Sequence, residues 1–300
     1  MQEIGKQYIK DDKTDPSGFL RRARLHQSVF RANYLDLPYD NYGNYLTRED
    51  GENGKNFYDG FGIFDAVKKY RKYNKPLYSN LLRSEHIPFN FFIPLDKDRI
   101  YCKKIVSDIL KSNITSVDRI EIEYAPKPKE NYLNDGTSFD AYIEYTDSDD
   151  SKGMIGIEVK YTEKEYKLEA NSKQEKDVND KNSAYYTVTN KCGLFKTNSI
   201  GVLPTDNFRQ IWRNHILGES ILIADNPKFK HFTSLTLFPA DNAHFSKTSK
   251  EYIELLVSND NKFIALTYED FFALLKKHCP ESKYENWINY LTIRYIVSKE

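Results

Sequence analysis

Two stretches decide the fold: Phe139-Asp-Ala-Tyr-Ile-Glu-Tyr145 and Gly153-Met-Ile-Gly-Ile-Glu-Val-Lys-Tyr161. Both alternate apolar and polar residues, which is the period of a β-strand with one apolar face. The residues between them, 146–152, are rich in Asp and Ser and therefore favour a solvated turn. The sequence predicts that the two stretches form a β-hairpin.

The polar face of this hairpin carries three ionisable groups. Side chains alternate along a strand, so Glu158 and Lys160 share one face while Ile157 and Val159 point to the other. Asp140 meets this pair if the hairpin places it opposite Glu158 or Lys160. Burying two carboxylates and an ammonium together without a purpose costs free energy. We therefore expect a functional site here.

Metal-dependent phosphodiester hydrolysis is the chemistry that suits such a group. Aspartate and glutamate supply the hard oxygen ligands that Mg²⁺ prefers, and the backbone carbonyl of Val159 offers another oxygen. A bound metal ion lowers the pKa of water and neutralises charge on the scissile phosphate. A lysine ammonium can hold the attacking water or stabilise the pentacovalent transition state.

This pattern resembles the PD-(D/E)XK nuclease superfamily, which has the restriction-endonuclease-like fold. Three blocks occur in the order found in one bacterial group of such proteins: residues 84–92, 158–163 and 210–215. The resemblance covers about residues 20–275. It implies an α/β fold with a central mixed β-sheet flanked by helices, a Mg²⁺ or Mn²⁺ cofactor, and DNA as the partner.

The resemblance also implies roles for single residues. Asp140, Glu158 and Lys160 match the catalytic triplet, with Asp140 and Glu158 as metal ligands. Glu85 occupies the place of a further acidic ligand before the first core strand; the alternative is a helix-end pair of Glu85 with His86. Phe139 stands where the superfamily's name has proline.

Further candidates flank this triplet. Gln210 and Arg213 lie one turn apart on a predicted helix, where they can contact a phosphate or orient the attacking water. Glu163 is either a supporting acid of the site or a surface charge. His215 is interpreted as a packed histidine rather than a general base. The aromatic residues within 89–92 are interpreted as core rather than as a base-stacking platform.

Two charged segments each allow two interpretations. Glu121 and Glu123 are interpreted as a solvated strand face, with a third metal ligand as the alternative. The basic residues between Lys68 and Lys75 form either a solvated helix face or a surface that follows nucleic-acid phosphates.

The remaining pattern outlines one large domain. Helices are expected within 64–82 (two short ones), 101–110, 208–223 and 268–277, and strands at 119–124, 235–238 and 264–267. Residues 164–190 are highly charged and are interpreted as a polar insertion or mobile flap. Residues 1–63 are expected to pack as an N-terminal segment on a nuclease-like domain of residues 64–300.

Composition narrows the class of protein. The 300 residues include 18 Phe and 23 Tyr, enough bulk for a core, which argues against global disorder. Lys plus Arg and Asp plus Glu both number 44, so a phosphate-binding surface must be a local patch. The three cysteines form no CxxC pair, which argues against structural zinc and disulfides. No apolar run is long enough to cross a membrane. We expect a cytoplasmic protein with no membrane partner.

The sequence thus predicts a metal-dependent nuclease that hydrolyses DNA phosphodiester bonds. Two alternatives stay open: a nuclease acting on RNA, and a nucleic-acid-binding or assembly module of the same fold whose site is dispensable. A homodimer or an activating protein partner is compatible with this prediction, because double-strand cutting often pairs two active sites.

Overall fold

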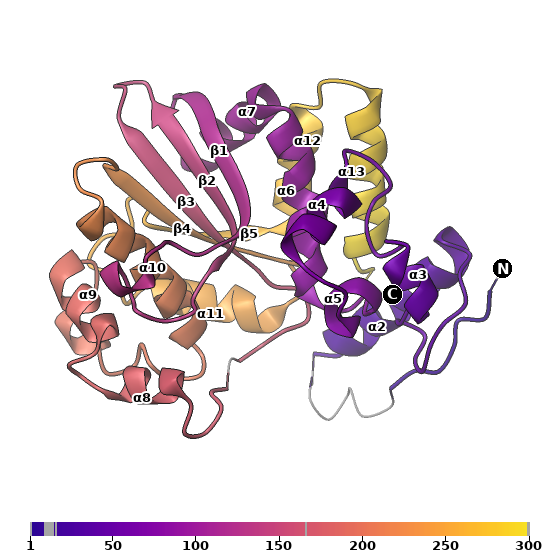
Figure 1. Cartoon of the computed structure of the whole chain (residues 1–300), viewed down its shortest axis with the longest axis horizontal. Helices are drawn as coiled ribbons and strands as arrows, with labels where there is room; N and C mark the ends of the chain where they lie inside the picture. The colour runs from indigo at the N-terminus through magenta and orange to yellow at the C-terminus, as the bar shows by residue number, and fades with distance from the viewer. Residues whose placement is uncertain (1, 9–14, 16, 166, 299–300) are drawn as a thin grey trace.

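A five-stranded mixed sheet forms the centre of the computed structural model, which describes residues 2–8, 15, 17–165 and 167–298 (Figure 1). The strands follow the order β1-β2-β3-β4-β5. They span Ile114–Tyr124 (β1), Phe139–Asp147 (β2), Lys152–Val159 (β3), His231–Phe238 (β4) and Phe263–Thr267 (β5). Strands β1 to β3 pair antiparallel, whereas β4 and β5 continue the sheet in parallel. The predicted α/β fold with a mixed sheet is confirmed.

The predicted hairpin is β2 and β3. Ala141 pairs with Ile157 and Ile143 with Ile155, and continuing this register by one pair sets Asp140 opposite Glu158. A Cβ atom at Gly156 would collide with the ring of Phe139, so this glycine leaves room for that ring on the face of the hairpin.

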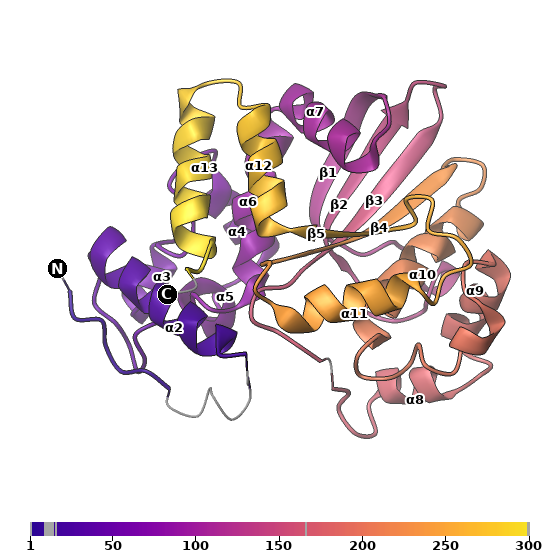
Figure 2. The ribbon, with the colours of Figure 1, turned by 180° about the vertical axis from the view of Figure 1, so that it is seen from behind.

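Helices cover both faces of the sheet, as the two opposite views show (Figures 1 and 2). One face, with Ile143, Ile157 and Leu235, packs in the larger core. The helices of that core are α2 (Phe19–Val29), α4 (Ile63–Tyr70), α5 (Lys75–Ser79), α6 (Ile87–Lys97), α7 (Arg99–Leu110), α12 (Tyr268–Lys277) and α13 (Ser282–Tyr295). The other face, with Met154 and Phe232, packs against α8 (Lys173–Asn179), α9 (Ala184–Cys192), α10 (Arg209–Ala224) and α11 (Ala243–Ile253).

Short elements complete the chain. They are helix α3 (Arg48–Glu52), a π-helical turn (Phe30–Tyr34) and three 3₁₀ turns (Ser84–His86, Lys129–Asn131 and Thr197–Ser199). None of the helices among the described residues is long and apolar enough to cross a membrane.

Helix α10 lies close against the sheet. Its apolar positions, among them Ile211, Trp212 and Ile216, are buried. A Cβ at Gly218 would run into the ring of Phe232 on β4, so glycine lets the helix approach the strands. This close approach brings the N-terminal half of α10 over the polar face of the β2–β3 hairpin.

Most predicted elements are present, with one difference. The two short helices within 64–82 are α4 and α5, and Pro76 lies in the first turn of α5, where proline is tolerated. The segment 164–190 differs from a polar flap, because it includes most of α9. Tyr185 and Tyr186 of α9 are buried against Trp212 of α10. The flap prediction overlooked these aromatic residues.

The N-terminal segment contacts the end of β3. Phe19 of α2 packs edge-on against Tyr161 with the ring centroids 6.3 Å apart. Gln27 donates hydrogen bonds to the Tyr161 hydroxyl (2.9 Å) and to the backbone carbonyl of Arg294 (2.6 Å). Helix α2 thereby links the strand that carries Glu158 to the C-terminal helix α13.

Candidate active site

The hairpin brings Asp140, Glu158 and Lys160 together on the sheet face that α10 covers. Glu158 and Lys160 form an ion pair, and their side chains are only 7% and 6% exposed. Asp140 is half-buried, and its carboxylate accepts a 2.7 Å hydrogen bond from the backbone N–H of Val159. The sequence prediction that these three residues share one face is met by this geometry.

Two amides of α10 hold the Glu158 carboxylate. Gln210 Nε2 donates to Glu158 Oε1, and Asn214 Nδ2 donates to Glu158 Oε2. Because residues four apart lie on one helix face, the pair reaches the same carboxylate. Gln210 therefore lies where the sequence prediction expected a supporting residue. Asn214 was missed, because the spacing of Arg213 from Gln210 is equally compatible with one helix face.

The site concentrates negative charge. Burial, followed by the nearby charge of Glu158, raises the pKa of Asp140 well above its ordinary value, although the Lys160 ammonium and the Val159 N–H act in the opposite direction. The carboxylates of Glu158 and Asp140 outweigh the opposing effect of burial on Lys160 and raise its pKa. Lys160 therefore keeps its positive charge at neutral pH.

Contacts at the end of β3 fix the backbone around Lys160. The Tyr268 hydroxyl donates to the Lys160 carbonyl at 2.6 Å, and the Lys160 N–H donates to the Leu237 carbonyl at 2.8 Å. Glu163 accepts hydrogen bonds from the N–H groups of Tyr161 (2.8 Å) and Ser84 (3.0 Å). Through these hydrogen bonds, Glu163 links the end of β3 to the 3₁₀ turn that precedes α6.

Glu85 lies apart from the triplet. It sits in the 3₁₀ turn, where its 40% exposed carboxylate pairs with Arg83 at 2.7 Å. Across residues 2–8, 15, 17–165 and 167–298, no group of three or more His, Cys, Asp or Glu is arranged to hold a metal ion. The structure therefore does not bring Glu85 to Asp140 and Glu158 as a third ligand. The next residue, His86, is buried, with Nε2 3.0 Å from a guanidinium nitrogen of Arg294.

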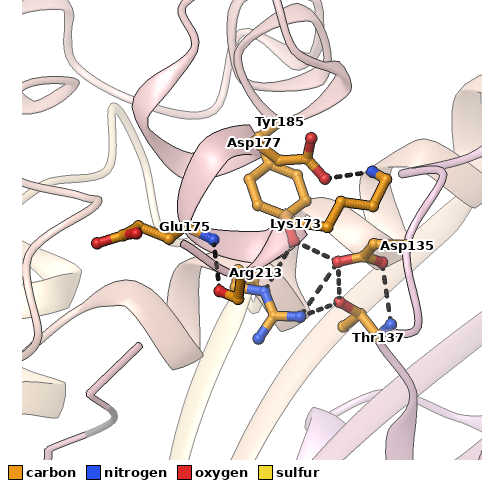
Figure 3. A network of polar contacts seen from close by, with 8 residues as sticks. Asp135, Thr137, Lys173, Glu175, Asp177, Tyr185 and Arg213 are labelled. Atoms are coloured by element: carbon orange, nitrogen blue, oxygen red, sulfur yellow. Dashed lines mark hydrogen bonds and ion pairs between the residues drawn. The ribbon is translucent and has the colours of Figure 1, made fainter. Parts of the chain in front are cut away.

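Arg213 points to a different set of partners, shown in Figure 3. Its guanidinium donates to the Tyr185 hydroxyl (3.0 Å), to Asp135 (3.1 Å) and to Thr137. Both members of the Arg213–Asp135 ion pair are largely buried. The predicted phosphate contact of Arg213 has no support in these contacts, which instead join α10 to α9 and to the loop before β2. The sequence analysis placed Gln210 and Arg213 on one helix face. In the structure, the helix face over Glu158 presents Gln210 and Asn214 instead.

His215 is a packed residue, as interpreted from the sequence. It is buried, Nδ1 lies 3.1 Å from the Tyr252 hydroxyl, and burial lowers its pKa to about 3. The aromatic residues Phe89, Phe91 and Phe92 are buried in the larger core, which also agrees with the interpretation.

Comparison with known proteins supports the assignment to a family. No curated protein and no solved structure matches the chain. The family model of the PD-(D/E)XK nuclease superfamily, by contrast, matches residues 10–297, and these residues include the hairpin, both core layers and α10. The chain belongs to the PD-(D/E)XK nuclease superfamily.

Proposed function

We propose that this protein is a metal-dependent nuclease that hydrolyses phosphodiester bonds in DNA at Asp140, Glu158 and Lys160. The observation that carries the proposal is the meeting of these three side chains at the end of β3. Membership of a nuclease superfamily supports the reaction class.

The donor set suits a divalent metal ion. Asp140 and Glu158 offer hard carboxylate oxygens. Burial first, and the nearby charge of Glu158 second, raise the pKa of Asp140, and a bound cation would favour its charged form. Nucleases of this superfamily generally use divalent metals, commonly Mg²⁺. Asp140 and Glu158 would hold the ion. When bound, the ion supplies a Lewis acid that neutralises charge on the phosphate and lowers the pKa of a water molecule.

The other residues act on the nucleophile and on the ligands. The Lys160 ammonium has three N–H donors, and one is directed to Glu158. The remaining two can orient the attacking water and stabilise negative charge on the phosphate as it develops. Gln210 and Asn214 are positioning residues, because they fix the Glu158 carboxylate through its oxygens.

A non-catalytic nucleic-acid-binding module is the second candidate. The observation in its favour is that both oxygens of Glu158 already accept hydrogen bonds, from Lys160, Gln210 and Asn214. Such a module would bind nucleic acid without turnover. RNA is the alternative substrate, since the phosphodiester chemistry is shared.

Incubation of the purified full chain with supercoiled plasmid tests the proposal. We expect Mg²⁺ or Mn²⁺ to be required, EDTA to stop cleavage, and Lys160→Gln to abolish it. Glutamine keeps an N–H donor for Glu158, so the variant should retain the parent's circular dichroism spectrum. A labelled RNA of matched sequence, run in parallel, separates the two substrates. Binding without cleavage of either nucleic acid would favour the non-catalytic module.

A further inference from the structure

The last turn of α4, the residues that follow it and the start of α5 carry a cluster of exposed positive charges, which we call the basic arm. Its members are Lys68, Lys69, Arg71, Lys72 and Lys75, all exposed. Three of them have acidic partners: Lys68 pairs with Asp65 (2.8 Å), Lys75 with Asp40 (2.7 Å), and Arg71 with Glu123.

Two lysines of the basic arm keep an uncompensated charge. Lys69 and Lys72 form no ion pair with any residue that the structure describes. Because the whole chain has a formal net charge of zero, these unpaired charges create a local positive surface rather than adding to a basic protein.

The Arg71–Glu123 ion pair joins Arg71 of the basic arm to the strand next to Asp140. In the β1–β2 register, Ile122 pairs with Ala141 and Tyr124 with Phe139, so Glu123 lies across from Asp140. Neighbouring strands lie about 4.8 Å apart. The charge of Glu123 also acts on Asp140 directly. Arg71 is therefore anchored one strand away from Asp140.

We propose that the basic arm is a phosphate-binding surface that seats the nucleic-acid backbone next to Asp140, with Lys69 and Lys72 as its free phosphate contacts. Exposed lysines bind phosphates without regard to sequence, and their long side chains can follow a backbone. Between them, Tyr70 is 40% exposed and adds a flat ring to the same surface. The inference rests on the proposed function in one respect: the nucleic-acid backbone that the basic arm binds is also the substrate that the site hydrolyses.

Binding measured without cleavage tests the arm separately from catalysis. The probes are a fluorescein-labelled DNA duplex and an RNA duplex of the same sequence, titrated with the full chain in EDTA at several NaCl concentrations. The test variant is Lys69→Ala/Lys72→Ala. The matched control is Lys191→Ala/Lys228→Ala, which removes the same charge from exposed positions. Lys191 lies on α9, which is at one end of the molecule, away from α4 (Figures 1 and 2). Lys228 precedes His231, which pairs with Gly153 at the other end of β3 from Glu158.

We expect the test variant to lose about tenfold in affinity at low salt and the control to match the parent. The slope of log K against log salt should fall by about two for the DNA duplex, since each lost phosphate contact removes about 0.9. Loss with only one of the two probes would identify the preferred nucleic acid and still support the arm.

The inference would be overturned by parental affinity and slope in the test variant, by an equal loss in the control, or by the absence of binding by the parent. Loss of binding to a poly-glutamate peptide but not to nucleic acid would assign the surface to an acidic protein and overturn it as well. If metal-dependent cleavage is absent while Lys69 and Lys72 still determine binding, the proposed function is wrong but the inference about the basic arm stands.

Discussion

Glu158 is a buried carboxylate surrounded by N–H donors from Lys160, Gln210 and Asn214. A buried charge is tolerated only when such donors replace the water that it has lost. The same donors fix the orientation of the carboxylate. At the scale of single residues, the site is therefore set by α10 as much as by the strand that carries Glu158.

Asn214→Leu should lower the free energy of unfolding by about 2 kcal/mol. The substitution keeps the branched shape and the number of side-chain heavy atoms but leaves Glu158 Oε2 without its donor, and an unsatisfied buried acceptor costs about 1–3 kcal/mol. Urea denaturation followed by circular dichroism measures the change. In a Glu158→Leu background the cost should fall below about 1 kcal/mol, since no carboxylate remains. An equal cost in both backgrounds would mean that Asn214 acts through packing alone.

The buried His215 should make the free energy of unfolding of the protein depend on pH. Burial lowers its pKa to about 3 in the folded protein, below about 6.5 for an unfolded histidine. Between these values the unfolded chain binds the extra proton, so stability falls as the pH falls from 6.5 towards 3. From pH 7.5 to pH 5 this group alone should cost about 2 kcal/mol.

The measurement is urea denaturation at both pH values for the parent, for His215→Gln and for the control His231→Gln at the start of β4. His215→Gln should reduce the loss of stability on acidification, whereas the control should retain it. Identical losses in the parent and in His215→Gln would contradict the assignment of a buried neutral histidine.

The residues of the triplet could be predicted because a strand alternates its side chains strictly. Once Ile157 and Val159 are assigned to the core, Glu158 and Lys160 must share the other face. Helical faces are broader, and spacings of three and four are both compatible with one side. The sequence therefore gave no means to choose between Arg213 and Asn214 as the neighbour of Gln210.

At the scale of elements, the contacts of Arg213 join three segments, namely α10, α9 and the loop before β2 (Figure 3). Arg213→Leu should lower the free energy of unfolding by about 3 kcal/mol, because it leaves Asp135 buried without its cation. Amide hydrogen exchange should also quicken in α9. Arg48→Leu is the control, since the exposed Arg48–Glu52 pair contributes little to stability. An Arg213 variant as stable as this control would contradict the role.

Elements with a clear period could be predicted, and elements without one could not. Strands β2 and β3 alternate, and α7 shows apolar residues at helical spacing. Helix α6 was not predicted, because residues 87–95 are all buried and leave no polar face, and because Pro88 and Pro94 interrupt the pattern. Because α6 is buried on every side, its packing compensates for the unfavourable free energy of placing Pro94 inside a helix.

At the scale of the whole molecule, the two core layers should unfold as one unit, because the single sheet lies between them. The only two tryptophans, Trp212 on α10 and Trp287 on α13, report on one layer each. In Trp212→Phe and in Trp287→Phe, the remaining fluorescence should follow the same urea transition as circular dichroism of that variant. Fluorescence and circular dichroism transitions at different urea concentrations would show two separately folding parts.

The central claim is that Asp140 belongs to a hydrolytic site, and a matched pair of variants on β2 tests it most directly. Asp140→Asn keeps an oxygen that accepts the Val159 N–H but removes the negative charge. Asp147→Asn makes the same change at the far end of the strand, where Asp147 accepts a hydrogen bond from Ser112.

The measurement is the initial rate of plasmid cleavage in Mg²⁺ for the parent and both variants, with circular dichroism to establish folding. Asp140→Asn should reduce the rate more than about a hundredfold, since loss of even an indirect partner of a metal ligand costs 10–100-fold. Asp147→Asn should cleave at the parental rate. Full activity of Asp140→Asn would contradict the account.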